Sequence, residues 1–185
     1  MLAYVFWHWK QSDIAVVKYE IRQRAFHAAL ADTPPSGFDG SFSVGLSHLP
    51  WEAGGGNAYE DWYMVKDFSA LGLLNEAAFS NGRAVAHDAA AAGAAGGAGG
   101  LYALRQGKAL RNPHYSHWIS KPRGMQSAEL IARFSATVKL AKGALWMRQM
   151  ALGPAQQFCL HAATPVPVPD EFSPLVVPLR PIWPQ

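Results

Sequence analysis

The sequence has few of the features that mark secreted, membrane-spanning or zinc-binding proteins. It contains one cysteine, Cys159, so no disulfide can form within the chain. It has no run of about 18 uninterrupted apolar residues, and its start lacks the basic and apolar regions of a signal peptide. HExxH and CxxC motifs are missing as well. We therefore expect a cytoplasmic protein without a membrane span and without a zinc site.

Charged residues are also scarce, at 16% of the chain, and they are unevenly distributed. Residues 1–104 hold 6 Lys/Arg against 10 Asp/Glu, whereas residues 105–185 hold 10 against 3. The basic residues are scattered and form no nucleic-acid-binding motif, so nucleic acid is not an expected partner. The basic second half indicates attraction between the halves, an anionic ligand or a solvated basic surface.

Aromatic residues are abundant, and two aromatic segments echo each other. Residues 4–10 read Tyr-Val-Phe-Trp-His-Trp-Lys, and residues 115–121 read Tyr-Ser-His-Trp-Ile-Ser-Lys. Both contain Tyr-x-x-Trp-x-x-Lys with an internal His, at an offset of 111 residues (Tyr4 to Tyr115). Helix-like sequence follows each segment. This self-similarity indicates two copies of one α+β unit.

The first half alternates strand-like and helix-like segments. The helix expected over 13–31 would bury a stripe of apolar residues, and the glycine runs at 54–56 and 96–100 are expected to be a loop and a turn. Strands are predicted at 2–9, 38–46, 59–68 and 101–105, and helices at 13–31, 70–79 and 83–95. The expected buried stripe is Ile14, Val17, Ile21, Ala25 and Ala28.

The second half repeats this order less completely. A proline-punctuated stretch, 164–174, stands where a second helix is expected, and 175–182 reads as an edge strand. Strands are otherwise predicted at 114–120, 145–152 and 156–162, with a helix at 127–142.

The echoed segment and the β-α-β-β-α-β order resemble the dimeric α+β-barrel superfamily. That group includes antibiotic-biosynthesis-type monooxygenases, EthD-like proteins, chlorite-dismutase-like haem proteins and dye-decolourising peroxidases; the Gly-x-x-Asp-Gly signature of the last is absent here. The resemblance implies an α+β fold of two ferredoxin-like repeats, residues 1–107 and 108–185. Their sheets would face each other as an intramolecular, pseudo-dimeric barrel.

Alternate residues of a strand share a face, which groups the candidate site residues. Tyr4, Phe6 and His8 lie on one face of the first strand, and Tyr115 and His117 share a face in the echo. We expect these faces to meet in an inter-sheet cleft. The two histidines and two tyrosines would be the catalytic acid, base and donor groups, and Phe6 would stack on a flat ligand.

Two other arrangements fit the same alternation. The residues could simply pack at a repeat interface, with their polar atoms satisfied by neighbours. With the faces exchanged, Trp7 and Trp118 would occupy the cleft instead.

Two further groups could contribute to a site. Lys121 and Arg148 are candidates for an anionic ligand, although Arg148 could instead pair with Asp61 or Asp67. A Cys159/His161 pair remains formally possible as a nucleophile and base.

No cofactor is expected, and His87 is the one weak candidate for a haem or metal ligand. Arg83 lies one turn earlier, where it could meet a propionate.

These patterns predict a protein that binds, or acts without a cofactor on, a small aromatic or polyketide-like molecule in the cleft. The alternative is a non-catalytic protein whose aromatic strands form a homo-oligomer interface. A haem-binding member of the same superfamily is the third possibility.

Overall fold

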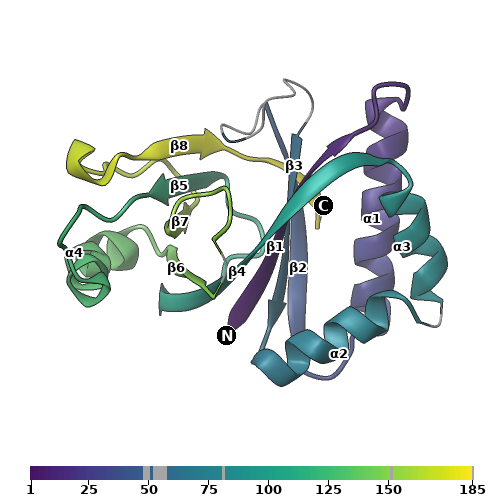
Figure 1. Cartoon of the computed structure of the whole chain (residues 1–185), viewed down its shortest axis with the longest axis horizontal. Helices are drawn as coiled ribbons and strands as arrows, with labels where there is room; N and C mark the ends of the chain where they lie inside the picture. The colour runs from purple at the N-terminus through teal and green to yellow at the C-terminus, as the bar shows by residue number, and fades with distance from the viewer. Residues whose placement is uncertain (48–50, 52–57, 81, 151, 185) are drawn as a thin grey trace.

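The fold is α+β, with the described residues forming one nine-stranded antiparallel sheet and four α-helices (Figure 1). The computed structural model describes residues 1–47, 51, 58–80, 82–150 and 152–184. The strands are β1 (Leu2–Lys10), β2 (Phe38–Leu46), β3 (Ala58–Val65), β4 (Ala94–Gly107), β5 (Tyr115–Ile119), β6 (Ala144–Gln149), β7 (Phe158–Ala162), β8 (Leu175–Pro178) and β9 (Arg180–Trp183). The helices are α1 (Val16–Asp32), α2 (Phe68–Ala78), α3 (Arg83–Ala91) and α4 (Ser127–Leu140), with a short 3₁₀ turn at Asp170–Phe172.

The strand order is β8-β5-β7-β6-β4-β1-β3-β2-β9. Only Leu179 separates β8 from β9, yet these two strands stand at opposite ends of that order. One extended C-terminal segment therefore pairs with β5 through β8 and with β2 through β9. The predicted edge strand thus brings the two ends of the sheet together, and the sheet closes on itself.

Helices cover the outside of this closed sheet (Figure 1). In Figure 1, α1, α2 and α3 lie beside the strands of the first half, and α4 lies on the opposite side of the molecule. No helix of the described chain is long and apolar enough to cross a membrane. The predicted loop at 51–57 lies, apart from Trp51, outside the described residues.

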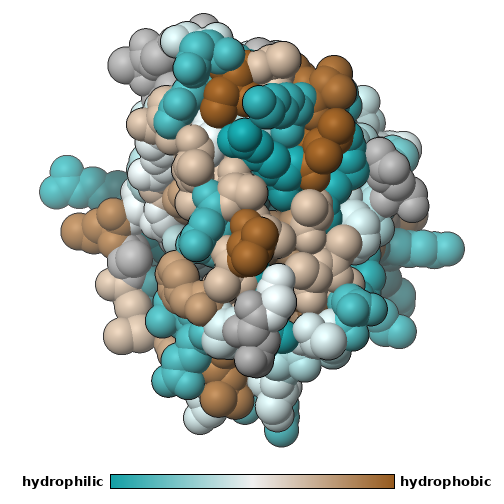
Figure 2. Space-filling view, turned by 90° about the vertical axis from the view of Figure 1, so that its right-hand side faces the viewer, coloured by the Kyte–Doolittle hydropathy of each residue, from teal (hydrophilic) through white to brown (hydrophobic). Residues whose placement is uncertain are grey.

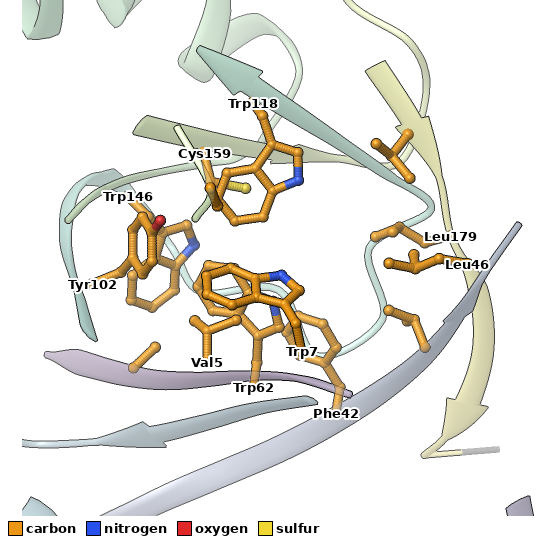
Figure 3. Close-up of a cluster of buried hydrophobic side chains, with 14 of the residues drawn as sticks. Val5, Trp7, Phe42, Leu46, Trp62, Tyr102, Trp118, Trp146, Cys159 and Leu179 are labelled. Carbon is orange, nitrogen blue, oxygen red and sulfur yellow. The ribbon is translucent and has the colours of Figure 1, made fainter. Parts of the chain in front are cut away.

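The interior enclosed by the sheet is filled by aromatic side chains (Figure 3). Trp7 of β1 and Trp118 of β5 point toward each other, with ring centroids 5.7 Å apart. Further large side chains complete this inter-sheet core, among them Phe42, Trp62, Tyr102 and Trp146. The expected inter-sheet cleft is therefore a packed core, because indole rings bury large areas when they meet in a water-free interior.

The glycine run before residue 101 is strand, and the prediction of a turn there was wrong. β4 begins at Ala94, and its glycines accept the large rings of β1. A Cβ at Gly97 would lie 2.5 Å from the Phe6 ring, and one at Gly99 would lie 2.8 Å from the Tyr4 hydroxyl. Close approach of a neighbouring group is a common reason for glycine inside a strand.

Helix α1 buries a different face from the predicted one. Val17 and Ile21, which were expected to be buried, are 67% and 55% exposed. The buried face instead carries Tyr19, Glu20, Gln23, Phe26, His27 and Leu30. Apolar periodicity failed here because this helix covers a polar sheet surface, where hydrogen-bonding partners decide which side faces inward.

Candidate functional site

The candidate site is a cavity of about 700 Å³ between the first-half sheet and helices α1, α2 and α3. Its floor is formed by β1 and β3, and its walls are mostly apolar. The lining includes seven aromatic side chains, Tyr4, Phe6, Tyr19, Phe26, Tyr63, Phe68 and Phe79, and the polar residues Gln23, Asp61, Asn75 and His87. Figure 2 shows that hydrophobic and hydrophilic side chains are intermixed on the helix-bearing face of the molecule.

The predicted assignment of faces is reversed. Trp7 and Trp118 occupy the inter-sheet core, whereas Tyr4, Phe6 and His8 lie on the outer face beneath the helices. Tyr4 and Phe6 therefore line a cavity, but one in the sheet–helix layer. The exchange has a physical reason, since indoles gain most from the dry interior and the imidazole finds hydrogen-bonding partners on α1.

A buried carboxylate organises the polar end of this cavity. Asp61 of β3 is 1% exposed and lines the cavity. Its Oδ2 accepts a hydrogen bond from the Tyr63 hydroxyl at 3.0 Å. The Nε2 atoms of His8 and His27 lie 3.2 and 3.4 Å from the same oxygen, although neither is aligned as a hydrogen bond. The other oxygen, Oδ1, is buried without a hydrogen-bond partner.

The surroundings of Asp61 keep it ionised. Burial alone would raise its pKa, but the electrostatic attraction of the His8 and His27 rings, whose Nε2 atoms lie close to Oδ2, outweighs burial and lowers the pKa below its usual range. Burial, and secondarily the Asp61 charge, raises the pKa of the Tyr4, Tyr19 and Tyr63 phenols. The cavity thus holds one carboxylate among neutral tyrosines.

His8 connects the carboxylate to a cavity-lining tyrosine. Its Nδ1 lies 2.6 Å from the Tyr19 hydroxyl. A nitrogen lone pair would be repelled by the Asp61 carboxylate, so the proton of the neutral ring belongs on Nε2. Nδ1 then accepts the Tyr19 O–H, and the Tyr19 oxygen keeps its lone pairs. A Tyr19–His8–Asp61 chain of this kind can pass a proton.

His27 forms a second arm on the same carboxylate. Its Nδ1 lies 2.7 Å from the Ser41 Oγ, and its ring stacks on Tyr63 at 5.0 Å. Ser, His and Asp in a row suggest a nucleophilic serine. Ser41 is not among the residues that line the cavity, so this arm positions Asp61 and does not attack a substrate.

The second-half residues of the predicted site lie away from this cavity. His117 is fully buried on the outer face, where its Nδ1 donates to the Leu160 carbonyl at 3.2 Å. Its Nε2 accepts from the Val166 N–H at 3.0 Å. Burial lowers the pKa of His117, which favours the neutral ring. Through its two hydrogen bonds, this ring holds the proline-rich segment at Val166 against the sheet. Tyr115 is half-buried and does not line the cavity.

Lys121 and Arg148, the residues predicted to bind an anionic ligand, donate hydrogen bonds to backbone carbonyls instead. Lys121 Nζ donates to the Met125 carbonyl, and Arg148 donates to the carbonyls of Gly153 and Ala155. Neither residue lines the cavity. Asp61 and Asp67 are not partners of Arg148, since Asp67 accepts from the Ala70 N–H and so caps α2.

The proposed Cys159/His161 pair is buried in and against the inter-sheet core. Burial raises the pKa of Cys159 well above its usual value and lowers that of His161 to about 3. His161 packs edge-on to Trp62 with centroids 4.4 Å apart. A protonated thiol in a dry core is a poor nucleophile, so these residues are packing groups.

His87 lines the cavity from α3 and packs against two phenylalanines. Its ring is edge-on to Phe79 at 4.4 Å and to Phe26 at 5.3 Å, and its Nδ1 lies 3.0 Å from Asp88. Arg83 donates to the Ala77 carbonyl and to the carbonyl and hydroxyl of Thr33. Within the described residues, no group of three or more His, Cys, Asp and Glu could hold a metal ion.

Sequence reasoning missed the helical half of the site. Tyr19, Gln23 and His27 recur at intervals of four residues, which places them on one face of α1. Asp61 and Tyr63 alternate on β3 in the same way. These spacings were available in the sequence, but only the tertiary structure shows that the two sets meet, since Tyr19 contacts His8 of β1 and His27 contacts Asp61 of β3.

Comparison with known proteins supports the fold. No protein-family model matches the chain, and no curated protein sequence matches it significantly. A proposed monooxygenase of Fusobacterium nucleatum subsp. nucleatum is similar over 98% of this chain and 92% of its own, with a TM-score of 0.66 and 12% identity. A proposed monooxygenase of Lactobacillus acidophilus NCFM is similar over 98% and 94%, with a TM-score of 0.53 and 10% identity.

A third structure, an anthrone oxidase-like protein, reaches a TM-score of 0.49 at 6% identity, too low to support a shared fold. The chain is therefore an α+β protein of the same fold as the two proposed monooxygenases.

Proposed function

We propose that the first-half cavity binds a small aromatic molecule and that the protein oxidises it with dioxygen. The observation that carries this proposal is a largely aromatic cavity of about 700 Å³ with a buried, ionised Asp61 and a linked tyrosine at its polar end. Pockets of this size and character are typical of small-molecule sites. The description of two fold relatives as proposed monooxygenases points to the same reaction class.

The chemistry assigned to the chain is proton transfer. A substrate proton passes to the Tyr19 oxygen while the Tyr19 O–H passes its own proton to His8 Nδ1. The nearby Asp61 carboxylate stabilises the imidazolium that forms, at 3.2 Å from Nε2. Loss of the proton makes the aromatic ring electron-rich enough to react with dioxygen.

The overall reaction can balance with substrate and dioxygen alone. A phenol and O₂ give a quinone and water: one oxygen atom enters the ring and the other leaves as water with two substrate hydrogens. The substrate supplies the four electrons. 1-Naphthol, which would give 1,4-naphthoquinone, is a suitable probe.

The test is single-turnover oxidation of 1-naphthol under dioxygen labelled with oxygen-18, followed by mass spectrometry. We expect one labelled oxygen in the quinone. Tyr19→Phe removes the proton path and should slow turnover about 10²–10⁴-fold. Tyr115→Phe is the matched control, because Tyr115 lies outside the cavity. Unlabelled quinone, or equal rates for the two variants, would contradict the proposal.

We further propose that residues 1–107 and 108–185 are two ferredoxin-like repeats forming a pseudo-dimeric barrel. The strand orders β4-β1-β3-β2 and β8-β5-β7-β6 support it, because each group follows the same connectivity. Trp7 and Trp118, which correspond in the echo, both lie in the inter-sheet core. Superposition of residues 1–68 on 112–162 should overlay β1 on β5 and α1 on α4; a poor overlay would reject the duplication.

A further inference from the structure

The lining of the cavity carries negative charge without a compensating lysine or arginine. Among the described lining residues, Asp61 is the only carboxylate and none is Lys or Arg. Arginines of the surrounding helices are occupied elsewhere. Arg24 pairs with Glu20 at 3.9 Å, and Arg83 donates to chain carbonyls. A buried anionic ligand would therefore meet a carboxylate with no lysine or arginine in the lining to offset its desolvation.

The lining includes hydrogen-bond donors, namely the Tyr4 hydroxyl and the Gln23 and Asn75 amides, but the hydroxyls next to Asp61 are already used. The Tyr63 O–H is used in the hydrogen bond to Asp61, and the Tyr19 O–H is used in the bond to His8. Asp61 Oδ1, in contrast, is buried and without a hydrogen-bond partner. A buried acceptor left without a donor is costly, so the site is completed when a ligand supplies one.

The two imidazoles do not change this character. His8 and His27 direct Nε2 at Oδ2 of Asp61, and neither side chain is among those that line the cavity. Their second nitrogens are engaged with Tyr19 and Ser41. They hold the carboxylate in place and leave Oδ1 as its oxygen without a hydrogen-bond partner.

We propose that the cavity selects hydroxylated aromatic molecules without negative charge, whose hydroxyl donates to Asp61 Oδ1, and that it excludes aromatic carboxylates. This inference rests on the proposed function only in placing the ligand in the same cavity. It assigns a specificity role to Asp61 that is separate from proton transfer through Tyr19.

The test is isothermal titration of the wild-type protein, under anaerobic conditions, with three naphthalenes of matched size. 1-Naphthol carries the donor, 1-methoxynaphthalene lacks it, and 1-naphthoate carries a negative charge. We expect 1-methoxynaphthalene to bind roughly tenfold to a hundredfold more weakly than 1-naphthol, as for a lost hydrogen bond to a charged group. 1-Naphthoate should show no measurable binding.

Two variants test whether Asp61 causes this selectivity. Asp61→Asn keeps an oxygen at the site but removes the charge, so it should narrow the preference for 1-naphthol over 1-naphthoate at least tenfold. Asp39→Asn is the control, since Asp39 is exposed and contacts Arg111. The wild-type series stands alone if Asp61→Asn does not fold.

The outcomes separate this inference from the proposed function. Equal affinity for 1-naphthol and its methyl ether, tight binding of 1-naphthoate, or no binding of 1-naphthol would overturn the inference. The expected selectivity without incorporation of labelled oxygen would support the inference and reject the oxidation. Incorporation of labelled oxygen together with tight binding of 1-naphthoate would support the oxidation and overturn the inference.

Discussion

The two sheet–helix layers of this molecule differ in what they bury. Beneath α4, the second half packs Ile119, Leu130, Phe134 and Phe158 into a continuous apolar layer. Beneath α1, the first half places Tyr, Gln, His and Asp side chains around a cavity. In the sequence echo, Ile119 corresponds to His8 (119 and 8 differ by 111). One layer is filled by apolar side chains, and the other encloses the cavity to which we assign the proposed function.

This difference teaches that a candidate site can be recognised by what a helix buries. The α4 face of Leu130, Phe134 and Val138 needs no hydrogen-bonding partner. The α1 face needs several, and it finds them on β2 and β3 in Ser41 and Asp61. Burying polar groups in a linked network costs stability that a hydrophobic layer would provide, which is typical of functional regions.

The largest expected effect is the difference in stability lost when a phenylalanine is truncated to alanine in each of the two sheet–helix layers. Phe134→Ala should lower the free energy of unfolding by about 3–5 kcal/mol, because Phe134 is 3% exposed in a filled layer. Phe26→Ala should cost less, about 1–2 kcal/mol, since Phe26 already borders a cavity and fewer contacts are lost. Urea unfolding of both variants measures the difference. Equal losses would show that the two layers are packed alike.

The next effect compares the two faces of β3 through adjacent carboxylates. Glu60 accepts hydrogen bonds from Trp7 and Trp62 in the inter-sheet core, and burial raises its pKa to about 7. A raised carboxyl pKa contributes stability that is present below about pH 4.5 and is lost as the pH rises through 7. The free energy of unfolding should therefore fall by about 3 kcal/mol, relative to Glu60→Gln, between pH 4.5 and 8.

Asp61, on the opposite face, has the opposite sign. Its pKa is lowered, so its contribution to stability is present above the usual carboxyl range and is lost on acidification. Urea unfolding of wild type, Glu60→Gln and Asp61→Asn from pH 8 down to about pH 2 separates the two, because the Asp61 contribution is lost only below the usual carboxyl pKa. A pH-independent difference between wild type and Glu60→Gln would reject the buried, titrating Glu60.

A smaller effect sharpens the comparison of the two histidines. His117→Phe leaves the Val166 N–H and the Leu160 carbonyl without their partner and should cost about 1–3 kcal/mol of stability. Its affinity for 1-naphthol should be unchanged. His8→Phe should abolish 1-naphthol oxidation, because Tyr19 loses its proton acceptor. Calorimetric titration and turnover assays would reject the assignment if His117→Phe weakened ligand binding.

The smallest expected effect concerns haem. His87 packs between Phe26 and Phe79 and has no second ligand among the described residues. Added hemin should therefore give no sharp Soret band in an absorbance scan. A sharp band that disappears in His87→Ala would show that the first-half cavity binds haem, and it would contradict the proposed cofactor-free oxidation.

Much of the local structure could be predicted from the sequence. The polar–apolar alternation over Phe38–Leu46 predicted β2, and the apolar spacing near 127–140 predicted α4. The glycines of β4 could not be assigned in the same way. They read as a turn until the rings of Tyr4 and Phe6, which are distant in sequence, are seen to lie against them.

The candidate site was predicted in part. Tyr4 and Phe6 were identified and do line a cavity, but the cavity lies on the other side of the sheet from the one expected. The partners of His8 were not identified, because Tyr19 and Asp61 lie on other elements, α1 and β3.

The sequence alone determined which side chains share a face, because strand alternation and helical periodicity are local properties of the backbone. It placed Trp7 opposite Phe6 and His8, and Trp118 opposite His117. Only the tertiary structure decided which face turned inward. That choice depends on the free energy of whole layers: the tryptophans gain most in the dry space between the sheets, and the polar residues are satisfied only against α1.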